Sequence, residues 1–432
     1  MKKLLIRHGR VVDPAQKIDR VLDLLIDRVS GRVEKIADRI AAPTRTVEVL
    51  DAKGLIVTPG LIDIHVHFRE PGGSAKETIE TGAAAAVHGG FTSVVTMPNT
   101  SPPLDNPPQL IYQIRQGEKA GRARVYPSAC VSVGREGKTL APLGTLVKAG
   151  AVCFTDDGAP VASAGLMRLA LEYGRFLNVA VSEHAEDTSL SNGAVINDGP
   201  TAAVMGINGY PSVAEEIIVS RDILLARDTG GRVHIQHVST AGAIHMIRRA
   251  KHDGVPVTCE VTPHHLLLDD TACAGFDPIF KMNPPLRSKA DVAACLLGLR
   301  DGTIDCIASD HAPHTAEEKR TEFALAPNGV IGLESTVGVM LELLYHREKM
   351  KLPRIVELLT AGAAAIYNLP AGTLAPGSFG DVTLLDLNRP WTIDRETFHS
   401  KARNCPFHGW KVRGAPVKTI VGGRIFDAIG AT

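Results

Sequence analysis

The middle of the chain, from about residue 55 to about residue 350, alternates short β-branched runs with longer segments rich in Ala and Leu. Unbroken apolar runs favour strands, and apolar residues recurring every three or four positions favour helices. Eight strands are expected, at residues 61–68, 91–99, 124–132, 151–157, 178–184, 232–239, 256–265 and 303–311. Helical segments separate them, among them residues 76–90, 163–174, 212–230 and 290–302. This α/β pattern predicts a (β/α)8 barrel.

Both ends of the chain have a different pattern. Residues 1–58 and 372–432 contain short alternating runs broken by Gly, Pro and Asp, which indicates β-hairpins. Neither end alone has enough strands for a stable sheet. We therefore expect the two ends to form one small β-sandwich domain beside a barrel of residues 59–371.

The overall charge is balanced, with 47 Lys plus Arg against 47 Asp plus Glu in 432 residues. No basic excess is available to neutralise a nucleic acid or an anionic membrane, so neither is an expected partner. Charges return at Arg7 before a signal-peptide core could form, and no segment reaches the ~18 to 20 apolar residues of a membrane span.

The cysteines indicate the cellular compartment. There are seven, an odd number, with no C-x-x-C pair and mostly apolar neighbours. Reduced thiols and a cytoplasmic location are therefore expected.

Polar residues gather where the expected strands end, which is the end at which barrels of this kind carry their chemistry. These residues are His65, His67, Arg69, Asn99, Asp157, His184, His237, His264, His265 and Asp310. Because side chains alternate along a strand, the pair His65 and His67 projects from one face and can reach one ion. Four histidines and two aspartates suit Zn²⁺, with one or two ions and a coordination position left for water.

Some of these positions stay open on sequence alone. Asp156 and Asp157 are adjacent and lie on opposite faces, so alternation does not decide which one points inward. His234 has the opposite parity to His237, so it is expected to face the helices if His237 points into the barrel. His264 and His265 either bind a metal or shape their loop. His311 is expected to support a ligand rather than to be one.

Two residues have a predicted role beyond metal binding. Asp310 is the candidate for proton transfer, because a carboxylate beside an activated water can take its proton and pass it to a leaving nitrogen. Arg69 has the parity of His67 and should point across the barrel mouth, where its guanidinium can bind a substrate carboxylate. Asn99 and His314 could share that anion.

Nine motifs follow one another in order along nearly the whole chain: HVHFREPG (65–72), MPNT (97–100), TDDG (155–158), EH (183–184), HVS (237–239), EVTPHHL (260–266), KMNPPLR (281–287), ASDHAPH (308–314) and GLE (332–334). Together they resemble the dihydroorotases of the amidohydrolase superfamily, in particular the long bacterial type. Many relatives in that superfamily bridge two metals with a carboxylated lysine. The run AVCFTDDG contains none, which is similar to the subgroup that uses an aspartate.

The resemblance implies the ligands and substrate contacts. It makes His65, His67, Asp157 and Asp310 ligands of one zinc and His184 and His237 ligands of a second, with Asp157 shared. It implies substrate contacts from His67, Arg69, Asn99, Asn283, His314, Asn328 and Gly329, where Asn283 meets the pyrimidine ring and the backbone of Asn328 and Gly329 meets its amide edge. The implied reaction is the reversible opening of dihydroorotate to N-carbamoyl-L-aspartate in pyrimidine synthesis.

Other functions remain as alternatives. Another cyclic-amide hydrolase, such as a hydantoinase, dihydropyrimidinase or allantoinase, has the same metal chemistry, but an uncharged substrate would leave Arg69 unpaired. A barrel without activity could serve as a structural partner of aspartate transcarbamoylase, but it should have lost metal ligands. We expect a homo-oligomer, with aspartate transcarbamoylase as a candidate partner of the active enzyme. The long charged loop at residues 313–330 is expected to close over substrate.

Overall fold

Eight short parallel strands form a closed barrel in the computed structural model, which describes residues 1–41 and 46–431. They are β8 (Leu61–Val66), β9 (Phe91–Thr96), β10 (Arg124–Pro127), β11 (Cys153–Phe154), β12 (Ala180–Glu183), β15 (Val233–Ile235), β16 (Val257–Val261) and β17 (Cys306–Ile307). They pair as two sheets, β10-β9-β8 and β11-β12-β15-β16-β17. Parallel bridges between Ala129 and Phe154 and between Val66 and His311 join the sheets at both edges. The predicted barrel fold is confirmed.

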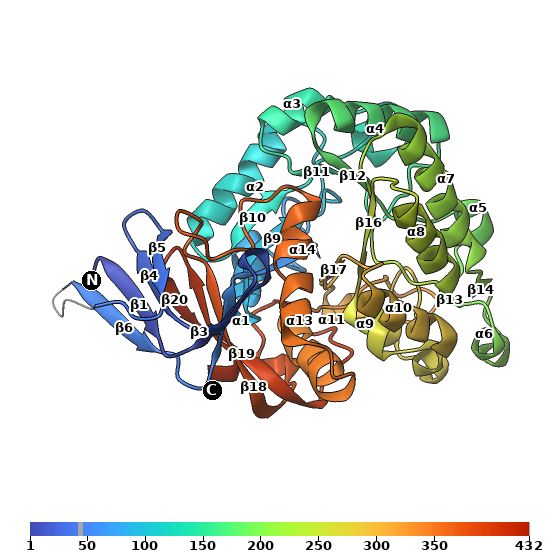
Figure 1. Ribbon diagram of the computed structural model, residues 1–432. Helices are drawn as coiled ribbons and strands as arrows, with labels where there is room; N and C mark the ends of the chain where they lie inside the picture. The colour runs from blue at the N-terminus through green and yellow to red at the C-terminus, as the bar shows by residue number, and fades with distance from the viewer. Residues whose placement is uncertain (42–45, 432) are drawn as a thin grey trace.

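Helices surround the barrel (Figure 1). The helices between the strands and after the last strand include α1 (Ile79–His88), α2 (Pro107–Ala120), α3 (Leu143–Lys148), α4 (Ala164–Leu177), α7 (Val213–Thr229), α8 (Ala241–His252), α10 (Lys289–Asp301), α12 (Thr336–Met340), α13 (Leu352–Leu358) and α14 (Ala361–Ile366). Local sequence sets their ends. A capping box of Ser288 and Asp291 starts α10, and Gly230, in the left-handed region at φ 67°, ends α7.

Short elements occupy the loops that follow the barrel strands. They are α5 (Thr188–Ser191), α6 (Pro200–Met205), α9 (Pro263–Leu267), α11 (Ala316–Lys319) and the paired strands β13 (Ile196–Asn197) and β14 (Gly209–Tyr210). The loop at 313–330 therefore contains one short helix, α11.

The remaining strands form a β-sandwich from both ends of the chain, with blue and red strands side by side in Figure 1. They are β1 (Lys3–Arg7), β2 (Arg10–Asp13), β3 (Ile18–Val21), β4 (Asp23–Asp27), β5 (Arg32–Ala37), β6 (Val47–Asp51), β7 (Ile56–Pro59), β18 (Val382–Thr392), β19 (Lys411–Val421) and β20 (Arg424–Asp427). One sheet has the order β5-β4-β1-β6 and the other β20-β19-β18-β7-β2-β3. Leu4, Ile6, Val57, Leu384 and Ile420 belong to the shared apolar core. The composite domain is confirmed, and its boundaries at 58 and 372 stay a prediction.

Polar contacts join the β-sandwich to the barrel. The Arg124 guanidinium donates to both Asp381 oxygens, at 2.7 and 3.1 Å, and Thr383 Oγ1 donates to the Gly90 carbonyl oxygen at 2.7 Å. Between β18 and β19 the chain also reaches the barrel mouth, where Asn404 Nδ2 donates to the carbonyl oxygens of Ala312 and Gly329 at 3.0 Å each. No helix in the described ranges is long and apolar enough to cross a membrane.

Candidate active site

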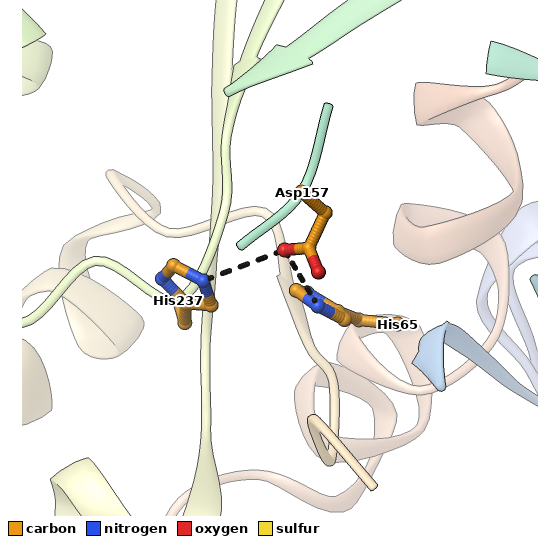
Figure 2. Close-up of side chains that lie close together, drawn as sticks. All are labelled: His65, Asp157 and His237. Carbon is orange, nitrogen blue, oxygen red and sulfur yellow. Dashed lines mark ion pairs between the residues drawn. The ribbon is translucent and has the colours of Figure 1, made fainter. Parts of the chain in front are cut away.

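The six predicted metal ligands come from five barrel strands and meet at one end of the barrel. His65 is on β8, and the others follow the strands: His67 after β8, Asp157 after β11, His184 after β12, His237 after β15 and Asp310 after β17. Two sets of three donor atoms lie within 4.8 Å of one another, namely His65, Asp157 and His237, and His65, His67 and Asp310. Figure 2 shows the Asp157 carboxylate between the two imidazoles of the first set.

The distances define two adjoining donor clusters. His67 Nε2 lies 3.0 Å from Asp310 Oδ1, and His65 Nε2 lies 3.3 Å from Asp157 Oδ1. On the other side of Asp157, His237 Nε2 is 3.9 Å from Oδ1. His184 is in neither three-donor set, but its Nδ1 lies 2.9 Å from His237 Nε2.

The far nitrogen of three of these imidazoles is held by a second side chain. Glu260 Oε1 lies 2.5 Å from His65 Nδ1, Asn99 Oδ1 lies 2.8 Å from His67 Nδ1, and Glu186 Oε2 lies 3.1 Å from His184 Nε2. Each contact places a proton on the outer nitrogen and leaves the inner nitrogen unprotonated toward the cluster, which is the usual arrangement around metal-binding histidines.

The buried carboxylates of the cluster are ionised. Burial would raise the pKa of Asp157 and of Asp310, but the imidazole of His65 and its neighbours outweigh it and hold both well below the usual range. Burial would also raise the pKa of Glu260, but the imidazoles of His65 and His234 have the larger effect and lower it to about 2. The donor cluster therefore presents negative charge to whatever it binds.

These residues fit a divalent metal ion. His65 Nε2 is buried, has no hydrogen-bond partner within residues 1–41 and 46–431, and lies 3.3 Å from Asp157 Oδ1. An orphaned buried imidazole nitrogen aimed at carboxylates is costly unless an ion is bound. Imidazole nitrogens together with carboxylate oxygens form a ligand set typical of zinc.

Three of the predicted site residues have strained backbones. Arg69, His237 and Asp310 have φ of 59°, 32° and 47°, in the left-handed region that residues other than Gly seldom adopt. Such strain collects at functional sites. The strands also end earlier than the sequence predicts, since β8 stops at Val66 and β15 at Ile235.

A cavity of about 190 Å³ opens in front of the donor cluster. Its lining residues are His67, Arg69, Asn99, Asp157, Gly158, His184, His237, Asn283, Asp310, Ala312, His314, Asn328 and Gly329. All seven residues predicted as substrate contacts are among them, so the fold brings these contacts and the metal donors to one space. Their individual roles stay predictions.

One wall of the cavity is suited to an anion. Arg69 Nε donates to the Pro313 carbonyl oxygen at 3.3 Å, and Nη2 lies 3.4 Å from His314 Nε2. Burial, and next the charge of Arg69, lower the pKa of His314 to about 3, so its imidazole is neutral. The positive charge of this wall therefore comes from Arg69.

Two other lining residues offer acceptors rather than donors. The Gly329 N–H already donates to the Lys281 carbonyl oxygen at 3.0 Å, and His314 Nε2 lies 2.8 Å from the Asn328 carbonyl oxygen. Since a carbonyl oxygen has two lone pairs, these backbone groups can still accept a hydrogen bond from a ligand N–H.

The structure resolves the choice between the adjacent aspartates. Asp156 Oδ1 accepts from the backbone N–H groups of Val131 and Ser132, at 2.9 and 3.1 Å, and so belongs to its loop. Asp157 is the residue that faces the imidazoles.

The expectation for His234 is wrong. Its Nε2 lies 3.2 Å from Glu260 Oε2, so it supports the carboxylate that holds His65 instead of facing the helices. Strand parity fails here because β15 ends at Ile235 and the chain turns at His237.

Two further histidines near the strand ends, His265 and His311, support their loops. His265 contacts Thr262 Oγ1 at 2.8 Å and the Pro284 carbonyl oxygen at 3.1 Å, and His264 belongs to neither donor set. His311 Nε2 lies 3.3 Å from Glu77 Oε2, and its Nδ1 accepts from the Gly332 N–H.

Sequence reasoning missed three residues that touch the site. Glu260 begins the motif EVTPHHL but had no assigned role, although a charged residue on a strand expected to be buried is a signal that could have identified it. Glu186 lies two residues after His184, and Asn404 lies in the irregular segment between β18 and β19. Neither carried a pattern that sequence reasoning could have used.

Comparison with known proteins identifies the relatives of the chain. Residues 54–243 match a family model described as dihydro-orotase-like. The dihydroorotase of Anaeromyxobacter dehalogenans is 50% identical over 429 residues, which is 99% of this chain and 98% of that protein. The dihydroorotase of Pelobacter propionicus is 47% identical over 98% of this chain and 99% of its own length. The chain belongs to the dihydroorotase family.

Solved structures place this dihydroorotase-family chain in a wider group of the same fold. The L-hydantoinase (dihydropyrimidinase) of Arthrobacter aurescens has a TM-score of 0.88 and 25% identity, covering 100% of this chain and 97% of that one. The dihydropyrimidinase of Brevibacillus agri has a TM-score of 0.84 and 25% identity, covering 99% and 95%. The barrel is therefore shared with cyclic-amide hydrolases of other substrates, while the dihydroorotase relatives are about twice as similar in sequence.

Proposed function

We propose that the chain is an active dihydroorotase, which reversibly interconverts dihydroorotate and N-carbamoyl-L-aspartate in pyrimidine synthesis. The observation that carries this proposal is Arg69 on the wall of the cavity that also presents the metal donors. Dihydroorotate has a carboxylate for that guanidinium, whereas a hydantoin or dihydrouracil would leave it unpaired.

The cofactor in this proposal is zinc, with one or two ions per chain. His65, His67, Asp157 and Asp310 would hold one ion, and His184 and His237, with Asp157 shared, the other. When bound, zinc supplies Lewis-acid polarisation of a carbonyl and lowers the pKa of a water molecule. The support is the donor geometry and the buried, unpaired nitrogen of His65, which has no partner in the described part of the chain.

In this proposal, different side chains of the cavity bind the substrate and transfer the proton. Arg69, Asn99 and His314 bind the substrate carboxylate, and Asn283 and the backbone of Asn328 and Gly329 contact the ring. Asp310, ionised and at the edge of the cavity, accepts a proton from the attacking water and passes it to the ring nitrogen as the C–N bond breaks. His67 also lines the cavity and would therefore be close to both a bound metal and the substrate.

The first test is hydrolysis of L-dihydroorotate by the purified protein, followed by ultraviolet absorbance, with the metal content of the same sample measured. We expect turnover that is lost on chelation and restored by zinc. A zinc-loaded sample that opens hydantoin or allantoin but not dihydroorotate would overturn the assignment.

We also infer the setting of the enzyme. A cytoplasmic location is supported by seven cysteines that are all buried free thiols.

Self-association is supported by α4, where Leu169, Tyr173 and Phe176 form an exposed apolar face with Phe176 86% exposed. Aspartate transcarbamoylase is the second proposed partner, since it would supply N-carbamoyl-L-aspartate. Size measurements on the pure protein, alone and with the transcarbamoylase, test both.

A further inference from the structure

Glu186 occupies a position between the two parts of the site. It lies in the loop between β12 and α5, and its side chain is only 12% exposed. Its carboxylate touches one predicted metal ligand, His184, and one predicted substrate contact, Asn283. Within residues 1–41 and 46–431, Glu186 is the carboxylate that contacts both His184 and Asn283.

One oxygen of Glu186 receives both contacts. Oε2 lies 3.1 Å from His184 Nε2, and Asn283 Nδ2 donates to the same oxygen at 2.8 Å. The other oxygen, Oε1, accepts a hydrogen bond from Ser191 Oγ. Ser191 therefore holds the carboxylate through Oε1, and the other oxygen, Oε2, faces His184 and Asn283.

The contact with His184 determines which imidazole nitrogen can bind a metal. Nε2 lies 3.1 Å from Glu186 Oε2 and also 3.1 Å from Asn283 Nδ2. Because the carboxylate is charged, it favours the tautomer with the proton on Nε2, so Nδ1 keeps a free lone pair. That Nδ1 faces His237 Nε2 at 2.9 Å. Two imidazole lone pairs therefore converge beside Asp157, as two ligands of one ion would.

The contact with Asn283 determines the orientation of its amide. The amino group is engaged by Glu186, so the carbonyl oxygen Oδ1 points away from Glu186. Oδ1 is buried, has no hydrogen-bond partner among residues 1–41 and 46–431, and belongs to a residue that lines the cavity. A buried carbonyl oxygen without a partner is matched by a ligand that brings an N–H.

We propose that Glu186 is a positioning residue that orients His184 with Nδ1 toward a metal ion and Asn283 with Oδ1 toward the substrate, where it accepts a hydrogen bond from a ring or carbamoyl N–H. This inference rests on the proposed dihydroorotase function. It makes Asn283 the hydrogen-bond acceptor in its contact with the substrate. It also connects that contact to metal binding, because Glu186 orients both Asn283 and His184.

The variant Glu186→Gln separates charge from size. The amide has nearly the shape of the carboxylate, but it has no charge and keeps only one oxygen that can accept a hydrogen bond. We expect the affinity of the apo protein for the weaker of two zinc ions to fall about 10- to 100-fold, the usual effect of removing such a support. We expect the KM for dihydroorotate, measured at saturating zinc, to rise about tenfold.

Two further variants isolate the two contacts. Asp187→Asn is the matched control, because it removes the neighbouring carboxylate charge, whose hydrogen bonds go to Ser189 and not to the site, and both quantities should stay within about twofold of the wild type. Asn283→Ala should raise the KM and lower zinc affinity less than Glu186→Gln does, because Glu186 keeps its contact with His184. In that background, Glu186→Gln should add little to the KM, since the group it orients is gone.

The outcomes separate this inference from the proposed function. Wild-type zinc affinity and KM in Glu186→Gln would overturn it, and so would KM effects of Glu186→Gln and Asn283→Ala that multiply independently. A wild type that holds one zinc per chain would overturn the part concerning His184. If the wild type does not open dihydroorotate, the proposed function fails, while the zinc titrations still test His184. Should Glu186→Gln not fold, Glu186→Asp, whose carboxylate is one methylene shorter, is measured in the same way.

Discussion

Replacing Arg69 by Met removes the one strong positive charge on the anion wall of the cavity. Met is unbranched and flexible, so it fills much of the space of the arginine stem without donating a hydrogen bond. Arg69 follows the predicted ligand His67 by two residues but is in neither donor set, so the zinc should stay bound. The substitution therefore tests carboxylate binding separately from metal binding.

The size of the effect follows from the geometry. The guanidinium is largely buried and already oriented by its bond to the Pro313 carbonyl oxygen at 3.3 Å. Truncating one partner of a buried, hydrogen-bonded charge pair costs about 2 to 5 kcal/mol. At about 1.4 kcal/mol for each factor of ten, kcat/KM for dihydroorotate should fall about 30- to 4,000-fold.

The assay is steady-state hydrolysis of dihydroorotate by metal-replete protein, with zinc content measured on each variant. Arg69→Lys should lie between wild type and Arg69→Met, because it keeps the charge but loses the bidentate geometry. Arg249→Met is the matched control, since this exposed arginine on α8 is outside the cavity lining and its loss changes the net charge equally. A zinc-loaded Arg69→Met variant with a kcat/KM within about threefold of wild type would refute the reasoning.

Three further predictions concern neighbouring parts of the site. Glu260→Gln should lower zinc affinity about 10- to 100-fold in a titration of apo protein, because it weakens the hold on His65 Nδ1, and unchanged affinity would contradict that role. His314 should stay neutral at working pH, because burial and Arg69 lower its pKa to about 3. Since a base is neutral above its pKa, the KM for dihydroorotate should show no inflection from His314 between about pH 5.5 and 8. An inflection there that disappears in His314→Gln would count against this. Trypsin cleavage at Arg320, in the loop at 313–330, should slow when dihydroorotate is saturating, and an unchanged rate would argue against closure of that loop.

Much of the site could be anticipated because its residues sit where a local pattern ends. Each barrel strand is a short apolar run, and His65, Asp157, His184 and Asp310 come at or just after such runs. In a parallel barrel the carboxyl ends of all strands meet, so residues far apart in the chain can be assigned to one site without knowing any distance. The order of the motifs along the chain indicated the dihydroorotase family, and the relatives confirm it.

The assignments that failed or stayed open depended on where a strand stops. Alternation holds only inside a ladder, and β15 has left its ladder before His237 is reached, so the parity argument for His234 had no basis. The choice between Asp156 and Asp157 likewise depended on the backbone N–H groups of Val131 and Ser132, which belong to a different loop.

The sequence by itself therefore determined the barrel, the composite β-sandwich, the chemical types of the ligands and their order around the barrel. These depend on periodicity and on residue type, which are local properties of the chain. Only the tertiary structure decided which nitrogen of each imidazole faces the cluster, and that Glu260, Glu186 and Asn404 support the site. Those facts are distances between segments such as β8 and β16, separated by nearly two hundred residues, and they are set by packing rather than by any pattern along the chain.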